Sequence, residues 1–282
     1  MAELESDWGI TVGDAIAGGT AAFVAEAVRG DQLCALKLAP PEIDGIGPFS
    51  AEVDMLVAAG GRGYAEALCH DKVRRALLLE RLGARMADDG RTIDEWIVDL
   101  AALMQQGWSA GISAPASIAT GAEKAAWLAA FIERVWAKVD PPFPRTIVDE
   151  ARQFCERRIA AYDPSTAVLV HGDAHVWNAL AAPGGGYKLV DPDPFVAEPA
   201  ADLAVPMREW SEEILASGDP VGAVQARAAL LHDLTGVDLQ AIWEWGYMER
   251  VSTGLVWAIN DQWGQARAFF EVAEACVGAG PR

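Results

Sequence analysis

The sequence is short of basic residues, of cysteine and histidine, and of long apolar runs. Its 282 residues hold 22 Lys and Arg against 41 Asp and Glu, which gives a formal net charge of −19. A chain this acidic repels phosphate backbones and anionic lipids, so we expect neither a nucleic acid nor a membrane as its partner. A small cationic molecule is compatible with the charge.

Four cysteines are scattered through the chain without short spacings, and the four histidines form no cluster with them. This excludes a disulfide framework and a His/Cys zinc site, and it favours reduced thiols. No run approaches the ~20 apolar residues that a membrane-spanning helix needs. The acidic start lacks the basic head and apolar stretch of a signal peptide, so we expect a cytoplasmic protein.

What is present is the composition of a globular protein with a sizeable core. Apolar residues make up 52% of the chain and charged residues 22%. The length is near that of two typical domains and therefore predicts two lobes. The sequence contains no visible internal repeat. We expect an α+β protein with a small β-rich lobe over residues 1–82 and a larger, mainly helical lobe over residues 83–282.

The pattern of each lobe supports this division. In the first, strands are predicted over 8–14, 22–28, 33–38, 65–69 and 76–80, with a glycine-rich break at 17–21 and a helix over 49–59. In the second, apolar residues at helical spacing predict helices over 93–104, 122–136, 146–159, 220–231 and, with interruptions, 239–277. Only residues 167–191 revert to strands, at 167–170, 177–181 and 187–190.

One stretch, over residues 168–193, carries the chemistry. An apolar strand ends in a polar loop with Asp173 and, five residues later, Asn178; a hairpin then returns a second apolar strand that ends in Asp191. We expect the two strand ends to be neighbours, so that the three side chains converge. Two carboxylates and an amide oxygen are hard ligands that Mg²⁺ accepts while it shares substrate phosphates. The stretch therefore predicts phosphoryl transfer, with one carboxylate on the acceptor hydroxyl and the others on the metal.

The triplet His171-Gly-Asp173, with Asn178 and Asp191, resembles the catalytic signature of the aminoglycoside phosphotransferases, which have a two-lobed protein-kinase-like fold. The run that follows Asp191 looks closest to the streptomycin and hydroxyurea resistance kinases. The resemblance implies that ATP is the donor, that Asp173 is the catalytic base, and that Asn178 and Asp191 bind Mg²⁺.

The resemblance also implies supporting and nucleotide-binding residues. Lys37 lies on the third predicted strand, where the family keeps a phosphate-binding lysine, and Glu52 is the best candidate for its ion pair, with Asp54 as a rival. The other implied residues are, for support of the catalytic loop, His171, His175 and Asp202 and, for nucleotide binding, Gly18, Gly19, Thr20, Glu80 and Leu82. The chain departs from protein kinases in lacking their longer glycine-rich loop and their Asp-Phe-Gly triplet.

The acceptor side is expected among the C-terminal helices. Between residues 191 and 274, acids outnumber bases fifteen to four, and an acidic cleft attracts ammonium or guanidinium groups. The candidate acceptor-binding residues are Asp193, Glu209, Glu213, Glu249 and Asp261. Five tryptophans offer flat surfaces for cations, or else belong to the core: Trp210, Trp243, Trp245, Trp257 and Trp263.

The expected function is ATP- and Mg²⁺-dependent phosphorylation of a hydroxyl on an aminocyclitol antibiotic of the streptomycin type, by a monomer or dimer. Two alternatives stay open. One is a metabolic kinase for a sugar, an amino sugar, a choline-like alcohol or hydroxyurea. The other is a pseudokinase-like binding protein without catalysis.

Overall fold

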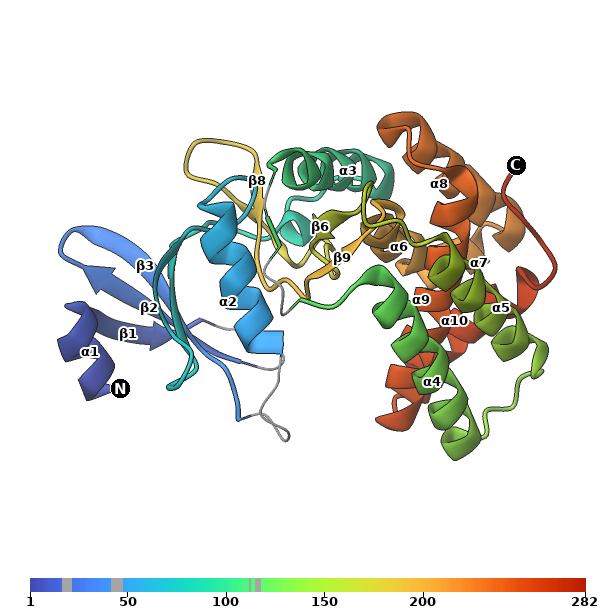
Figure 1. Ribbon diagram of the computed structural model, residues 1–282, viewed down its shortest axis with the longest axis horizontal. Helices are drawn as coiled ribbons and strands as arrows, with labels where there is room; N and C mark the ends of the chain where they lie inside the picture. Colours follow the sequence, from blue (N-terminus) through green and yellow to red (C-terminus); the bar gives the residue numbers. More distant parts are fainter. Residues whose placement is uncertain (17–21, 42–47, 112, 115–117) are drawn as a thin grey trace.

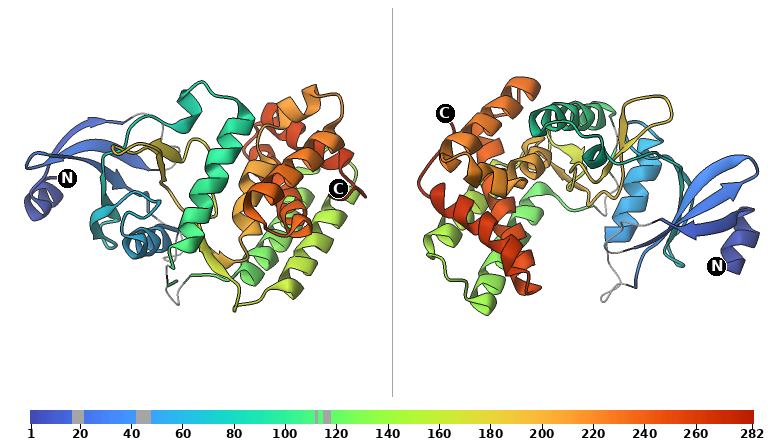
Figure 2. Two further views of the ribbon diagram at one scale, coloured as in Figure 1. Left: turned by 90° about the horizontal axis from the view of Figure 1, so that it is seen from above. Right: turned by 180° about the vertical axis from the view of Figure 1, so that it is seen from behind.

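The computed structural model describes residues 1–16, 22–41, 48–111, 113–114 and 118–282. A five-stranded sheet with one long helix forms one lobe, and a larger, mainly helical part forms the other (Figure 1). Both views of Figure 2 show the sheet at one end of the molecule and the orange and red helices at the opposite end. The predicted α+β class with two lobes is confirmed.

The sheet is antiparallel, with the strand order β1 (Thr11–Ala15), β2 (Phe23–Arg29), β3 (Gln32–Leu38), β5 (Ala76–Glu80), β4 (Ala67–Asp71). Side chains alternate across β3, which places Leu36 in a small apolar cluster on one face and Lys37 on the other. Helix α2 (Pro48–Ala59) packs against β4. The central strand thus presents Lys37 to the side of the sheet where α2 lies.

The start of the chain differs from its predicted strand over residues 8–14. Residues Ala2–Trp8 form helix α1, which ends at Gly9 with φ 61°. A left-handed residue is a common helix terminator and glycine adopts it without strain. Strand β1 therefore begins only at Thr11.

Helices make up most of the second part. The short 3-10 helix η1 (Met86–Asp88) precedes α3 (Ile93–Ser109) and α4 (Gly121–Val139), which both begin with capping boxes, at Thr92 and Thr120. The remaining helices are α5 (Thr146–Ala161), α6 (Ala200–Arg208), α7 (Ser211–Ala216), α8 (Pro220–Thr235), α9 (Leu239–Ile259) and α10 (Trp263–Ala275). No helix in these described segments is long and apolar enough to cross a membrane.

Helix α9 forms the centre of the helical core. It contacts α4, α5, α6, α8 and α10, and it is buried around almost its whole circumference. Trp243 and Trp245 are 1% exposed. These two tryptophans are core residues and not acceptor-binding surfaces.

Two short two-stranded sheets frame the polar loop. Strand β7 (Ala179–Ala181) pairs with β8 (Tyr187–Leu189), and β6 (Val168–Val170) pairs with β9 (Phe195–Ala197), a strand that the sequence pattern did not predict. Strands β6 and β8, which precede Asp173 and Asp191, belong to different sheets, but their ends are neighbours as expected, because Nε2 of His171 lies 2.9 Å from the carbonyl oxygen of Val190. The predicted strand over 177–181 begins only at Ala179, because the preceding residues turn.

Candidate active site

A cleft of about 1000 Å³ runs between the two parts of the molecule. Its lining comes from the sheet and the segment after β5, from the catalytic loop (residues 171–178), from the end of α6 and the start of α7, and from the sides of α9 and α10. Lys37, Asp173, Asn178 and Asp191 all line it. The structure thus brings together the four residues singled out from the sequence as the centre of the site.

Lys37 links the two parts of the molecule across this cleft. Its Nζ lies 2.6 Å from Oε1 of Glu52 on α2 and 2.8 Å from Oδ1 of Asp191. Burial alone would lower the pKa of Lys37, but the charges of Glu52 and Asp191 outweigh it and raise the pKa, so the amine is protonated. Asp54, the rival to Glu52, instead pairs with Lys72.

The backbone of the catalytic loop is tied to α6. The carboxylate of Asp202, fully buried, accepts hydrogen bonds from the N–H of His171 (3.1 Å), the N–H of Gly172 (2.8 Å) and Nε1 of Trp108 (2.8 Å). Gly172 has φ 81°, and a Cβ there would lie 2.0 Å from the carbonyl oxygen of Asp193. Only glycine fits this turn.

The His171 ring joins the loop to the strand that leads to Asp191. Its Nδ1 accepts from the N–H of Asp173 at 3.1 Å, and its Nε2 therefore carries the proton and donates to the carbonyl of Val190 at 2.9 Å. The ring stacks on Tyr64 with 6.0 Å between centroids, and burial lowers its pKa, so it is neutral. The N–H of Val190 bonds the carbonyl of Asn178. These contacts, rather than strand pairing, hold Asp173, Asn178 and Asp191 in one place.

Asp173 has a nitrogen donor beside each of its carboxylate oxygens. Nη2 of Arg208 lies 2.5 Å from Oδ1, and Nε2 of His175 lies 3.4 Å from Oδ2. Burial alone would raise the pKa of Asp173, but the hydrogen bond from His175 and the charge of Arg208 outweigh it and hold the pKa well below its ordinary value. Nδ2 of Asn178 donates to the Asp173 carbonyl, 3.0 Å away.

Asn178 and Asp191 offer oxygens suited to Mg²⁺. The amide nitrogen of Asn178 is used by Asp173, which leaves the amide oxygen as its acceptor, and Lys37 contacts Oδ1 of Asp191, whose side chain is 47% exposed. Asp191 has φ 56°, a left-handed conformation. No group of three or more His, Cys, Asp or Glu among the described residues forms a metal site. The two oxygen donors of Asn178 and Asp191 fit a cation that takes its other ligands from a phosphate substrate.

The last residue of β5, Glu80, and Leu82 in the segment that follows it line the cleft. The carboxylate of Glu80 accepts from the N–H of Glu66 and pairs with Lys188, and its own N–H bonds the carbonyl of Glu66. The Glu80 side chain is thus occupied by contacts within the protein. The nucleotide-binding candidates Gly18, Gly19 and Thr20 lie outside the described residues.

The acceptor candidates divide into two groups. Glu209 and Glu213 line the cleft, together with Glu212, Trp210 and Trp257. The others do not contribute to its described lining: Asp193 pairs with Lys124, Glu249 pairs with Arg208, and Asp261 lies at the exposed end of α9.

Arg208 is the site residue that the sequence pattern did not reveal. It lines the cleft and contacts Asp173, although the excess of acids between residues 191 and 274 predicted an acidic cleft. The sequence feature that could have pointed to it is that Arg208 is one of only four basic residues in this acidic range.

The chain is similar to known phosphotransferases over most of its length. No protein-family model matches the chain. It is 30% identical over 265 residues to a streptomycin 6-kinase from Streptomyces glaucescens, covering 92% of this chain and 82% of that protein. It is 29% identical over 266 residues to a hydroxyurea phosphotransferase from Kitasatospora aureofaciens, covering 93% of this chain and 73% of that protein.

Solved structures show the same fold at lower identity. A thermostable mutant of the aminoglycoside phosphotransferase APH(4)-Ia matches with a TM-score of 0.65, at 16% identity over 98% of this chain and 97% of the other. The choline kinase LicA from Streptococcus pneumoniae matches with a TM-score of 0.64, at 14% identity over 96% of each chain. A spectinomycin phosphotransferase, solved with ADP and spectinomycin, matches with a TM-score of 0.58, at 16% identity over 97% of this chain and 95% of the other. The fold is thus protein-kinase-like, and with its similarity to streptomycin 6-kinase the chain belongs to the aminoglycoside phosphotransferase family and is a phosphotransferase.

Proposed function

We propose that the protein transfers the γ-phosphate of ATP, with Mg²⁺, to a hydroxyl of a small cationic molecule, an aminocyclitol antibiotic of the streptomycin type. Residues 1–82 would hold the nucleotide, and residues 83–282 would carry the catalytic loop and the acceptor pocket. Dependence on ATP is consistent with action in the cytoplasm. The observation that carries the proposal is the meeting of Lys37, Asp173, Asn178 and Asp191 on one cleft.

Each of these residues has a role in the proposed reaction. Lys37, held by Glu52, binds the nucleotide phosphates. Asn178 and Asp191 hold Mg²⁺, which neutralises charge on the phosphates when bound. Asp173 accepts a hydrogen bond from the acceptor hydroxyl. This hydrogen bond orients the hydroxyl oxygen toward the γ-phosphate. Most of the catalysis then comes from position and charge, as expected for phosphoryl transfer.

The acceptor side of the cleft favours a cation. Glu212 and Glu213 supply negative charge, Glu209 adds a carboxylate that is paired with Arg208, and Trp210 and Trp257 supply aromatic faces. Carboxylates attract ammonium and guanidinium groups, and indole rings bind them through cation–π contacts. The similarity to streptomycin 6-kinases supports an acceptor of this type.

The same lining favours a second candidate, a metabolic kinase for a choline-like alcohol. Trp257 and Phe269 line the same cleft as the acidic residues, and aromatic side chains are the usual binding surface for quaternary ammonium groups. A choline kinase is also among the proteins with the same fold.

A coupled ADP-release assay separates these candidates. The purified protein is tested with Mg-ATP against streptomycin, spectinomycin, hydroxyurea, choline, ethanolamine and amino sugars, with and without excess EDTA. We expect turnover with streptomycin that EDTA abolishes. Turnover with choline alone would establish the second candidate. Absence of turnover, combined with no Mg-ATP binding in calorimetry, would establish a protein without catalysis.

A further inference from the structure

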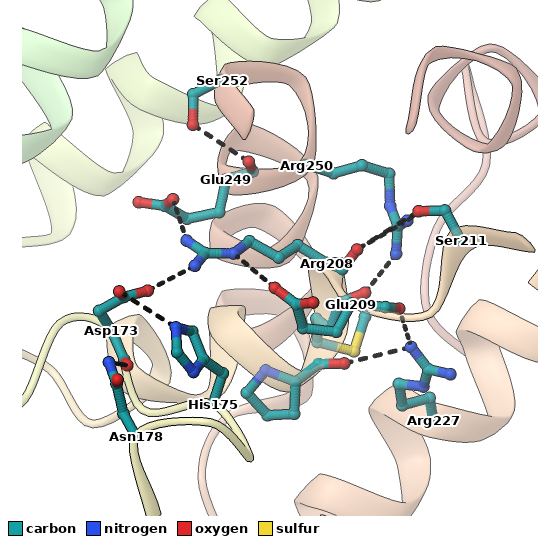
Figure 3. Close-up of polar contacts among 12 residues, drawn as sticks. Asp173, His175, Asn178, Arg208, Glu209, Ser211, Arg227, Glu249, Arg250 and Ser252 are labelled. Atoms are coloured by element: carbon teal, nitrogen blue, oxygen red, sulfur yellow. Dashed lines mark hydrogen bonds and ion pairs between the residues drawn. The ribbon is translucent and has the colours of Figure 1, made fainter. Parts of the chain in front are cut away.

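Arg208 has an arrangement that the proposed reaction does not explain. Its guanidinium contacts three carboxylates at once: Nη2 with Asp173 at 2.5 Å, Nη1 with Glu249 at 3.0 Å and Nε with Glu209 at 3.3 Å. Figure 3 shows the guanidinium between Asp173 and Glu249, with Glu209 beside it. The side chain is only 12% exposed, yet it lines the cleft.

Two other arginines, the buried Arg250 and the half-buried Arg227, hold the backbone that carries Arg208. Arg227 on α8 donates to the carbonyls of Pro206 (3.1 Å) and Glu209 (2.7 Å). Arg250 on α9 donates to the carbonyls of Met207 and Arg208 and to Oγ of Ser211 (Figure 3). We refer to residues 206–211 as the α6–α7 corner.

Neither of these two arginines forms an ion pair with a carboxylate among the described contacts. Burial lowers the pKa of Arg250 to about 9 and that of Arg227 to about 10. A buried charge without an anionic partner is unfavourable. The corner also contains Trp210 at φ 56°, a left-handed conformation for a bulky residue. The chain thus accepts several unfavourable features to keep this corner in one conformation.

Because the α6–α7 corner is held in one conformation, the Arg208 guanidinium has a fixed position beside the carboxylate of Asp173. Oδ1 of Asp173 is held by Arg208, and Oδ2 lies near His175. Through Glu209, the same guanidinium is connected to the acceptor side of the cleft. The orientation of Asp173 therefore depends on α6 and α9 as well as on its own loop.

We propose that Arg208 is a positioning residue for phosphoryl transfer, which holds the Asp173 carboxylate in line with the acceptor hydroxyl and fixes it relative to the acceptor pocket. This inference rests on the proposed function, because Asp173 must be the residue that binds the hydroxyl. Three N–H groups of one planar guanidinium contact Asp173, Glu209 and Glu249 at the same time. The ammonium group of a lysine does not reproduce this planar geometry.

Arg158 on α5 provides a matched control. Its side chain is also 12% exposed, and it also pairs with two carboxylates, Glu198 at 3.2 Å and Glu244 at 2.7 Å. It is not part of the described lining of the cleft. Comparing Arg208→Gln with Arg158→Gln therefore separates loss of position at Asp173 from loss of a buried ion pair.

We expect Arg208→Gln to lower kcat about 100-fold with little change in KM for ATP, since a displacement of about 1 Å at a catalytic group has this effect. Arg208→Lys, which keeps the charge, recovers part of the lost kcat. Arg158→Gln lowers the melting temperature as Arg208→Gln does but leaves kcat unchanged. Unchanged kcat in Arg208→Gln, or equal losses of kcat in the two Gln variants, would overturn the proposal.

A second readout does not depend on turnover. In crystal structures, the Asp173 carboxylate should leave its position in Arg208→Gln and stay near it in Arg208→Lys; a carboxylate that stays in place in Arg208→Gln overturns the proposal whatever the acceptor is. If Arg208→Gln does not fold, Arg208→Lys alone must show reduced kcat with unchanged KM for ATP. Failure of the proposed function itself would appear differently, as wild-type turnover in an Asp173 variant.

Discussion

At Asp173 the carboxylate is ionised over the whole physiological pH range. His175 and Arg208 lower its pKa despite the opposing effect of burial. A group with so little affinity for a proton is a weak base. Phosphoryl transfer passes through a loose transition state and needs little proton abstraction. We therefore propose that Asp173 orients the acceptor hydroxyl, and that the hydroxyl proton is removed late in the reaction.

The first prediction concerns this residue. Asp173→Asn keeps the shape but loses the charge and replaces one of the two acceptor oxygens by an NH2 donor, so kcat should fall roughly 10³-fold, with KM for ATP nearly unchanged. The ADP-release assay and calorimetric titration with Mg-ATP measure the two effects. Asp163→Asn is the control, because Asp163 is an exposed residue in the turn before β6. Near-normal turnover of Asp173→Asn would remove Asp173 from the mechanism.

The second prediction concerns Glu52, whose pKa burial raises to about 6 from an ordinary value of 4.5, despite Lys37. Between pH 4.5 and pH 6, the Glu52 carboxyl group therefore binds its proton more tightly in the folded protein than in the unfolded chain. The stabilising contribution of Glu52 is therefore complete below pH 4.5 and is lost as the pH rises through 6, by about 2 kcal/mol. Urea unfolding of wild type and Glu52→Gln from pH 4.5 to 7 measures it. A wild type that gains stability relative to the variant as the pH rises would contradict this sign.

At the level of elements, long helices and the hairpin could be predicted and short buried elements could not. Helices α3, α4 and α5 are amphipathic and begin at their predicted positions to within a residue. Helix α6 is buried on all sides from Ala200 to Met207 and contains Pro206, so it has no polar face to reveal its period. Strand β9 has only three residues. Both were missed for these reasons.

The same distinction applies to the site. Asp173 and Asn178 lie five residues apart in one loop, so their proximity follows from the sequence alone. The contact between Arg208 and Asp173 depends on the direction in which α6 leaves β9, which no local pattern encodes. Glu249 was expected to bind the acceptor, but its place on the buried helix α9 turns it toward Arg208 instead.

The third prediction tests the turn at the start of the catalytic loop. Gly172→Ala places a Cβ against the Asp193 carbonyl in a left-handed conformation, so it should destabilise the fold by about 3 kcal/mol or more and reduce kcat. Urea unfolding and the ADP-release assay measure both. Gly184→Ala is the control, since a Cβ at this hairpin glycine meets nothing within 4 Å. Equal behaviour of the two variants would exclude the steric explanation.

At the scale of the whole molecule, part of the acidic excess that gives the net charge of −19 lies at the cleft. Three glutamates at its acceptor side, Glu209, Glu212 and Glu213, lie within a five-residue segment. A field of one sign at the mouth of a cleft raises the local concentration of oppositely charged ligands, and salt screens it. If the acceptor is the cation of the proposed function, we expect the acidity of the chain to act on acceptor capture more than on the chemical step.

The fourth prediction follows from this field. Glu213→Gln should raise KM for a cationic acceptor about 3- to 10-fold at low salt, with kcat unchanged and a smaller effect at high salt. Steady-state kinetics at two salt concentrations measure it. Glu271→Gln is the control, because Glu271 lies on α10 outside the described lining of the cleft. An equal rise in both variants would assign the effect to net charge alone.

The tryptophans in the cleft give the protein an optical signal. Of its eleven tryptophans, Trp177, Trp210 and Trp257 line the cleft, and Trp177 is 46% exposed. A cation that settles against an indole changes its emission, so ligand capture becomes visible as quenching. Candidate molecules can then be screened by fluorescence titration, even with a variant that has lost turnover, and the acceptor can be identified before any product is sought.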